Sequence, residues 1–198
     1  MNVRIVALTL LLVAPASLAQ SYGTTAKAER AAMLDTLQRG KEIAVRTERY
    51  QLLPEVRAVE RGSSAQTPQE ALSLVNAGSA EVIETKGKLV LYRARGANPA
   101  LVQRVGATTV YPTVVNSRTG TLGVLTGTLV VKPKSMADAD AIAAGHGLQK
   151  TKTYPQLQTV FYRAKANVDI ADVSAALQAD PRVESAYPEI IEQVRVPK

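Results

Sequence analysis

The fold is decided by residues 128–187, which read TLVVKPKSMADADAIAAGHGLQKTKTYPQLQTVFYRAKANVDIADVSAALQADPRVESAY. Runs rich in Val, Leu, Tyr and Phe alternate here with Ala-rich runs in which apolar residues recur at helical spacing. The pattern predicts four strands and two helices. The strands are expected at 128–134, 148–154, 159–164 and 183–187, and the helices lie between the first and second strands and between the third and fourth.

Capping signals mark the ends of both helices. Ser135, with an acidic residue three positions later, opens the first helix, and Gly145-His146-Gly147 ends it. Asp169 caps the second helix, which ends at Asp180-Pro181. The order βαββαβ is that of the split βαβ or ferredoxin-like unit. We therefore expect an α+β protein whose C-terminal part is a ferredoxin-like domain.

The preceding part of the chain is predicted to contain a long helix, a short helix and two hairpins. Residues 24–49 lack proline and are rich in Ala, Glu, Lys, Arg and Leu, which predicts an amphipathic helix that Gly40 could divide into two. Thr67-Pro68-Gln69-Glu70 combines a capping box with proline at the first helical position and predicts a short helix. Hairpins are expected over 81–93 and 110–125.

Glycines are expected to shape the second hairpin and the strand that follows it. The turn falls at residues 116–120, NSRTG, because asparagine and glycine tolerate positive backbone angles. Gly120, Gly123 and Gly127 lack the spacing of a phosphate-binding loop and are expected to be turn or bulge residues. This interpretation predicts separate strands at 121–125 and 128–134.

Residues 1–20 have the three parts of a secretory signal peptide. Arg4 supplies the positive start, residues 5–13 are apolar apart from Thr9, and Ser17-Leu18-Ala19 offers small residues for cleavage after Ala19. The apolar run is shorter than the roughly 20 residues of a membrane-spanning helix. The sequence therefore predicts a periplasmic or secreted protein without a stable membrane anchor.

The expected organisation has five parts. They are a signal peptide at 1–19, an N-terminal helical segment at 20–66, a region of one helix and hairpins at 67–126, the ferredoxin-like domain at 127–189 and an extended tail at 190–198. The chain has no cysteine, so apolar burial alone is expected to stabilise it.

The composition disfavours several classes of function. Loss of Arg4 with the signal peptide lowers the net charge from +7 to +6. Because the protein is expected to be exported, a nucleic-acid partner is not expected, and the scattered basic residues fit a solvated surface. Phe161 and Tyr162 point to opposite faces of one strand and cannot form an RNA-binding aromatic platform.

His146 is the only histidine and lies between two glycines, which argues against a catalytic base or a zinc site. Asp138 and Asp140 fit a first helical turn better than a calcium loop. We expect no enzyme activity, no metal and no cofactor.

From residue 127 onward, the sequence resembles a known protein family. The strand 128–132, the alanine-rich helix ending in Gly-His-Gly-Leu, the strand ending at Tyr154-Pro155, and the run 180–189, DPRVESAYPE, are similar to propeptides of subtilisin-family proteases. Residues 116–131 further resemble the external chaperone of an Aeromonas serine protease, a separate exported protein with a propeptide-like C-terminal domain.

The resemblance implies a chaperone and inhibitor that acts in trans on a subtilisin-like serine protease, which is expected to be encoded nearby. Such domains lay their sheet against two surface helices of the protease and place their C-terminal tail in the substrate cleft by β-augmentation. The tail residues implied are Glu192, Gln193, Val194, Arg195, Val196, Pro197 and Lys198. The sheet and turn residues implied are Gln156, Leu157, Gln158, Phe161 and Arg163.

Two other functions remain open from the residues alone. One is a periplasmic adaptor or structural module that binds an envelope protein or an anionic surface through its basic N-terminal part. The other is a small-molecule sensor, because βαββαβ units often pair to bind ligands between them. The turn at 154–158 lacks the acid that related propeptides often place there, so that contact is expected either to be weaker or to be made by Gln156 or Gln158.

Overall fold

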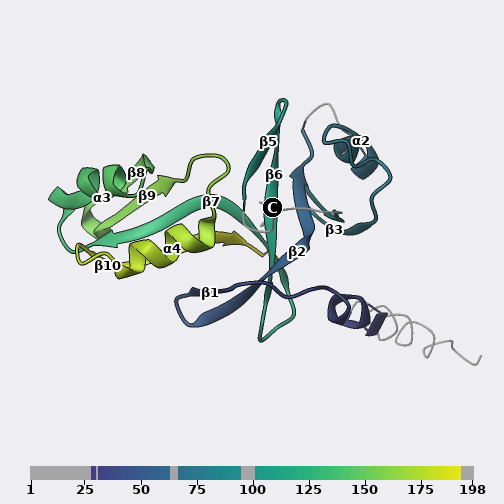
Figure 1. The fold of residues 1–198 in the computed structure, drawn as a ribbon, viewed down its shortest axis with the longest axis horizontal. Coiled ribbons are helices and arrows are strands. Elements are labelled where there is room, and N and C mark those ends of the chain that lie inside the picture. Colours follow the sequence, from purple (N-terminus) through teal and green to yellow (C-terminus); the bar gives the residue numbers. More distant parts are fainter. Residues whose placement is uncertain (1–27, 30, 63–66, 95–100, 193–198) are drawn as a thin grey trace, which may run out of the picture. The chain divides into compact units, whose positions relative to one another are not determined.

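The structure is a computed structural model that describes residues 28–29, 31–62, 67–94 and 101–192. The chain divides into two compact units, residues 1–36 and 37–198. In the first unit, the described residues are helical up to Asp35. The second unit is an α+β structure in which short helices accompany a largely antiparallel sheet (Figure 1). The α+β class predicted from the sequence is therefore confirmed.

The N-terminal helix is shorter than predicted. Residues 42–49, expected to be the last part of this helix, lie instead in the antiparallel hairpin of β1 (Glu42–Val45) and β2 (Glu48–Glu60). The helical prediction for this segment is wrong because Ile43, Tyr50 and Leu52 pack into one buried cluster, and burial of an apolar side chain outweighs helix propensity. Gly40 does not interrupt a helix, since its N–H donates to the Leu52 carbonyl at 2.8 Å.

A short helix and a hairpin follow as predicted. The helix α2 (Pro68–Ser73) begins with the predicted capping box, in which Thr67 and Glu70 each bind the other's backbone N–H. The strands β3 (Val82–Lys86) and β4 (Leu89–Arg93) form the predicted hairpin. β4 then pairs with β2, so that the hairpin extends the sheet.

The second predicted hairpin is also present. It joins β6 (Thr108–Asn116) to β7 (Leu122–Pro133), and a short strand β5 (Gln103–Val105) pairs with the start of β6. The prediction of separate strands before and after Gly127 is wrong, since β7 is continuous. Gly127 adopts a φ of +79° within it, where the pairing with the last strand shifts register, as expected for a bulge.

The C-terminal elements occur in the predicted order and near the predicted positions. After β7 come a 3-10 turn η1 (Met136–Asp138), α3 (Ala139–Gly145), β8 (Gln149–Tyr154), a second 3-10 turn η2 (Pro155–Leu157), β9 (Thr159–Arg163), α4 (Ile170–Ala179) and β10 (Val183–Ile191). Their strands pair antiparallel in the order β10-β7-β9-β8. β10 extends beyond the predicted end at Tyr187, because Ile190 and Ile191 continue the pairing along β7.

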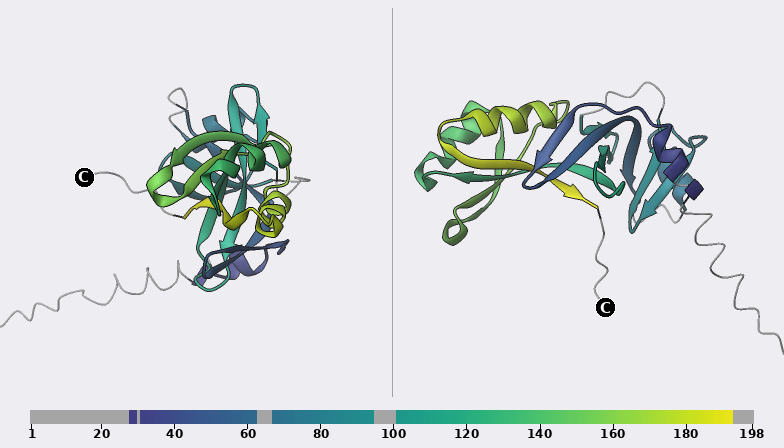
Figure 2. Two further views of the ribbon diagram at one scale, coloured as in Figure 1. Left: turned by 90° about the vertical axis from the view of Figure 1, so that its left-hand side faces the viewer. Right: turned by 90° about the horizontal axis from the view of Figure 1, so that it is seen from below.

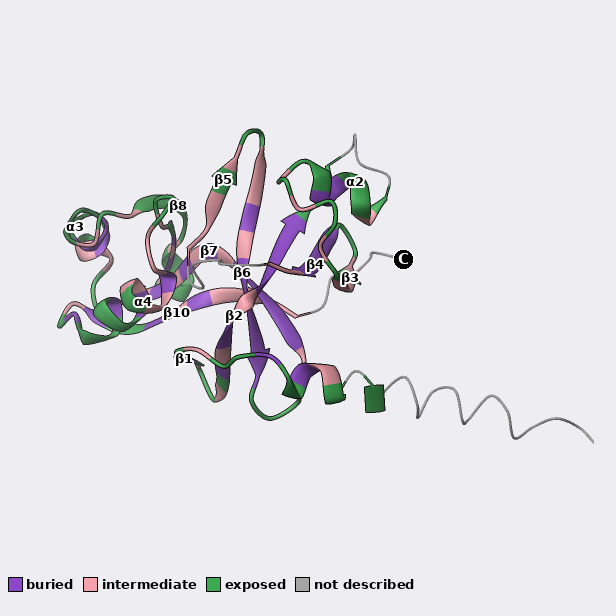
Figure 3. Cartoon of the chain, turned by 45° about the vertical axis from the view of Figure 1, so that its right-hand side comes forward, coloured by how far each residue is buried: buried purple, intermediate pink, exposed green. Residues whose placement is uncertain are grey.

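The core of this C-terminal part lies between its sheet and its two helices. Leu129, Val131, Val160 and Tyr162 from the strands pack against residues that include Ile142 of α3 and Leu177 of α4. Both helices therefore cover the same face of the sheet (Figure 2). Buried residues gather in the strands, whereas the outer sides of the helices are exposed (Figure 3). The opposite face of this sheet is covered by neither α3 nor α4.

Candidate functional site

The alternation of side chains along each strand creates a second sheet face, on the side away from α3 and α4. Because Val131 and Val160 point into the core, their neighbours along the strands point to the other side. We call this surface the open sheet face. Its members, taken from β7, β8, β9 and β10, are Val130, Lys132, Lys152, Tyr154, Thr159, Phe161, Arg163 and Tyr187.

Aromatic rings and cations are interleaved on the open sheet face. The rings of Tyr154 and Phe161 meet edge to face, with centroids 5.6 Å apart and planes inclined by 69°. The Lys152 ammonium lies 4.9 Å from the centroid of the Tyr154 ring, within the range of a cation–π contact. The sequence-predicted residues Phe161 and Arg163 thus lie on one face, and Phe161 is not part of the buried core.

The tip of the β1–β2 hairpin borders the open sheet face. Arg46 donates to the Tyr187 hydroxyl at 2.6 Å, and its guanidinium carbon lies 5.0 Å from the Tyr187 ring centroid. Beside this contact is a hollow of about 500 Å³, lined by residues that include Lys132 and Glu184, whose side chains form an ion pair of 2.7 Å. The sequence did not indicate Arg46 as a site residue, because the helix predicted over residues 24–49 placed it far from any sheet.

The turn between β8 and β9 projects the three predicted turn residues toward solvent. Gln156, Leu157 and Gln158 are all exposed, and 66% of the Leu157 surface is accessible. Gln158 has a φ of +48° and closes the turn in the left-handed region. A large apolar side chain at the tip of a tight turn costs free energy in water, so Leu157 is a candidate contact residue.

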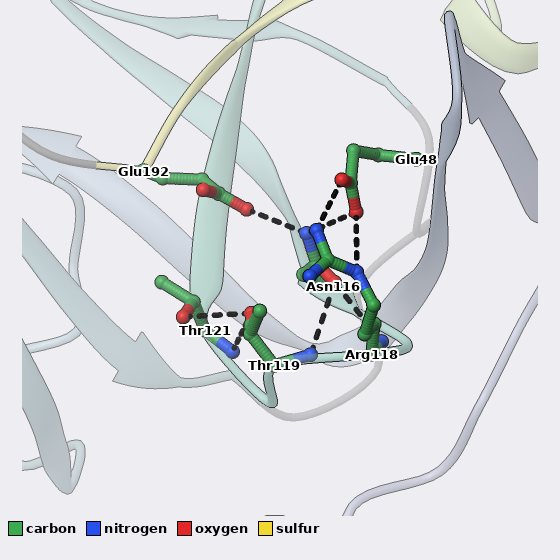
Figure 4. A network of polar contacts seen from close by, with 6 residues as sticks. All are labelled: Glu48, Asn116, Arg118, Thr119, Thr121 and Glu192. Carbon is green, nitrogen blue, oxygen red and sulfur yellow. Dashed lines mark hydrogen bonds and ion pairs between the residues drawn. The ribbon is translucent and has the colours of Figure 1, made fainter.

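The base of the C-terminal tail is fixed by a polar network (Figure 4). The Glu192 carboxylate accepts from Asn116 Nδ2 at 3.2 Å, and the Glu192 carbonyl accepts from Lys86 Nζ at 2.8 Å. Arg118 forms an ion pair with Glu48, which lies 3.4 Å from Asn116 Nδ2. Glu192, predicted as a protease-contacting residue of the extended tail, is therefore held within the fold. Gln193, Val194, Arg195, Val196, Pro197 and Lys198 lie outside the described residues.

The pKa shifts of Glu48 and Tyr50 agree with the contacts of this network. Arg118 holds the pKa of Glu48 below its ordinary value, chiefly through a side-chain hydrogen bond. Burial raises the pKa of Tyr50, and the neighbouring carboxylate of Glu192 adds to that shift. Glu48 is thus an anion at neutral pH and Tyr50 a neutral phenol.

His146 has a structural partner. Its Nε2 lies 2.9 Å from Asp180 Oδ2, and Asp180 also accepts hydrogen bonds from the side chain and the backbone of Arg182. Mainly because of Arg182, and also because of His146, the pKa of Asp180 is held well below its ordinary value. The contact connects the ends of α3 and α4, as expected for a structural role.

The described part of the chain contains neither a membrane-spanning helix nor a cluster of metal ligands. Its helices are all too short or too polar to cross a membrane. Among the same residues, no three or more His, Asp or Glu side chains come together as a metal site would require.

A family model described as "Open reading frame 2 N-terminal domain" matches residues 38–197, so this chain belongs to that family. No curated protein matches the sequence. A chain from the crystal structure of the Aeromonas sobria serine protease in complex with the chaperone ORF2 is similar over 49% of this chain and 99% of that chain, with 21% identity and a TM-score of 0.37.

Proposed function

We propose that this protein is an exported chaperone and inhibitor that acts in trans on a subtilisin-like serine protease. The observation that carries the proposal is the open sheet face, an aromatic and basic surface on a sheet whose other face is covered by α3 and α4. Membership of the family and the resemblance of residues 127–189 to propeptides support the same function.

The pairing order β10-β7-β9-β8 supports a ferredoxin-like arrangement for the C-terminal domain. In this proposal the open sheet face docks on helices of the protease, with Phe161 and Leu157 supplying apolar contact area. Lys152 and Arg163 favour a partner surface that is acidic, because opposite charges across an interface accelerate and orient association.

The tail acts as the inhibitory element in this proposal. Residues 193–198, QVRVPK, contain two valines and a proline, which favour an extended chain that can add as a strand to the edge of a substrate cleft. Their starting point at Glu192 is held by Lys86 and Asn116, which reduces the conformational freedom lost on binding.

Chaperone action and inhibition follow from one interface. A protein that binds the native-like protease better than the unfolded chain stabilises the folded protease by mass action. The same complex blocks the cleft while it persists. The role needs no enzyme activity of this chain, and we place it in the periplasm or outside the cell after cleavage near Ala19.

The test is a refolding and inhibition assay with residues 20–198. A denatured subtilisin-like protease is diluted into buffer with and without this protein, and hydrolysis of a chromogenic peptide is followed. We expect a higher yield of folded protease, detected by circular dichroism, together with suppressed hydrolysis. A chain ending at Glu192 should retain the chaperone effect and lose most of the inhibition.

A matched pair of variants tests the open sheet face. Phe161→Ser alters this face, whereas Ala176→Ser alters an exposed position on α4 on the other side of the sheet. We expect only Phe161→Ser to weaken binding to the protease, by about ten-fold or more as is common for a central aromatic contact. Equal binding by both variants would refute the assignment of the interface. If the unaltered protein neither raises the refolding yield nor suppresses hydrolysis with any of several subtilisin-like proteases, the proposed function is refuted.

A further inference from the structure

A pocket on another part of the molecule is unrelated to the open sheet face. It has a volume of about 770 Å³ and lies among the loop after α2, the end of β4 and the β5–β6 hairpin. Its apolar lining includes Val75, Ala80, Tyr92, Val105 and Val110. The volume falls within the range of about 300–1,000 Å³ that is typical of small-ligand sites.

A buried arginine lines this pocket. Arg57 of β2 is 1% exposed, and its cross-strand neighbour Tyr92 also lines the pocket. Arg57 Nη1 donates to the Leu101 carbonyl at 3.1 Å. The Nε and Nη2 atoms of Arg57 are buried and have no hydrogen-bond partner among the residues that the structure describes. The N–H groups of Nε and Nη2 lie along one edge of the planar guanidinium. This edge can bind a carboxylate through two parallel hydrogen bonds.

Glu81 and Arg93 also line this pocket, and the carboxylates of Glu81 and Glu55 lie near Arg93. Arg93 Nη1 lies 3.5 Å from Glu81, and Arg93 Nε lies 3.6 Å from Glu55. Within the described ranges, Arg57 has no ion-pair partner. Burial lowers the pKa of its guanidinium, but arginine remains charged at neutral pH. A buried cation without an anion is costly, and a bound anion would remove this cost.

We propose that this pocket binds a carboxylate with a compact apolar body, and that Arg57 holds the carboxylate through Nε and Nη2. Among the described residues of the wall, Arg57 is the cation without an ion-pair partner, and its one positive charge matches a monocarboxylate better than a phosphate dianion. Beside polar residues that include Asn76, Ser79 and Gln103, the wall carries valine, alanine and tyrosine side chains, which suit a small aliphatic body. Both a free organic acid and the C-terminal residue of a peptide have this chemistry.

The first test is an NMR titration of residues 20–198 at constant ionic strength. The probe is 4-methylpentanoate, and its neutral isostere 4-methylpentanamide is the control. We expect saturable shifts of the amide signals of residues 75–80, 92–94 and 103–110, with the neutral probe about ten-fold weaker or more. Equal shifts from both probes, shifts confined to other residues, or no saturation would overturn the proposal.

The second test separates the two ligand sources. N-acetyl-Ala-Val with a free carboxylate is compared with its C-terminal amide and with 4-methylpentanoate. Tighter binding of the dipeptide acid identifies the end of a chain as the ligand, whereas tighter binding of 4-methylpentanoate identifies a free acid. Binding of the dipeptide amide as tightly as the dipeptide acid would contradict both.

Two variants that each remove one positive charge complete the test. Arg57→Gln changes the pocket, and Arg104→Gln changes an exposed residue of β5. We expect Arg57→Gln to weaken binding of 4-methylpentanoate by about ten-fold or more and Arg104→Gln to leave it unchanged. Retained binding in Arg57→Gln would overturn the proposal. If Arg57→Gln does not fold, the comparison of 4-methylpentanoate with 4-methylpentanamide on the unaltered protein still tests the proposal.

Discussion

At the scale of single residues, Gly123 shows how closely β10 approaches β7. A Cβ built at Gly123 would lie 2.5 Å from Cγ2 of Ile190 and 3.1 Å from Cγ2 of Val114. Such distances are too short for a methyl group, so one of these side chains or its strand would have to move. Glycine at this position is therefore required by packing, whereas its backbone conformation is ordinary.

We expect Gly123→Ala to destabilise the protein by about 1–3 kcal/mol, the usual cost of overpacking a close contact. Urea unfolding followed by circular dichroism measures this change. Gly145→Ala is the control, because a Cβ there would meet only the flexible end of Arg182. Equal stability of Gly123→Ala and the unaltered protein would show that β10 is not held against β7 as described.

Asp180 gives a prediction that depends on pH. Asp180→Asn removes the charge that Arg182 and His146 bind, and we expect a loss of about 1–3 kcal/mol of stability at pH 7. Because folding depresses the pKa of Asp180 below its ordinary value of 3.8, its contribution is present above pH 3.8 and is lost as the pH falls further.

The difference in unfolding free energy between Asp180→Asn and the unaltered protein should therefore shrink below about pH 4. Urea titrations at pH 7, 5, 4 and 3 test this. A difference that stays constant down to pH 3 would mean that the Asp180 charge does not contribute as the geometry indicates.

At the scale of elements, α2 is a six-residue helix whose start depends on its cap. Thr67→Ala removes the hydroxyl that accepts from the Glu70 N–H, and we expect a loss of about 1 kcal/mol. Thermal unfolding measures it, with Gln69→Ala at an exposed position of the same helix as the control. Similar midpoints for the two variants would show that the cap has no energetic effect.

The β1–β2 hairpin shows how tertiary contacts override local preference. Residues 42–45, EIAV, and 48–52, ERYQL, contain good helix formers, but Ile43 and Tyr50 face each other across the hairpin and are buried together. Arg46, with a φ of +54°, makes the turn and reaches Tyr187. The capping box of α2 needed no such contact, because all its partners lie within four consecutive residues.

At the scale of the whole molecule, β7 and β10 connect the parts of the second unit. β7 pairs with β6 near Val124 and with β9 near Val130, and β10 runs beside it along both regions. The last described residues of the chain are therefore structural as far as Glu192. This arrangement separates the residues that stabilise the fold from those proposed to inhibit.

Two truncations test that separation. A chain ending at Glu192 should unfold at the same temperature as the unaltered protein, whereas a chain ending at Glu189 loses Ile190 and Ile191 from β10. We expect the shorter chain to lose about 2–4 kcal/mol, because two partly buried isoleucines and the contacts of Glu192 are removed. Calorimetry distinguishes them, and equal melting temperatures would contradict this division.

The sequence by itself determined the elements whose signals are local. These are the capped helices, the two hairpins and the order of the C-terminal strands, because caps, turns and alternating apolar residues act over a few neighbouring positions. It also indicated Phe161 and Arg163, whose spacing of two places them on one face of a strand.

Only the tertiary structure decided which surfaces these elements create. The N-terminal hairpin, the continuity of β7, the anchoring of Glu192 by Lys86 and Asn116, and the burial of Arg57 all depend on residues distant in the sequence. Local propensity amounts to tenths of a kcal/mol per residue, whereas burial of one large apolar side chain contributes about 1.5–3 kcal/mol. Where the two conflict, long-range packing determines the structure.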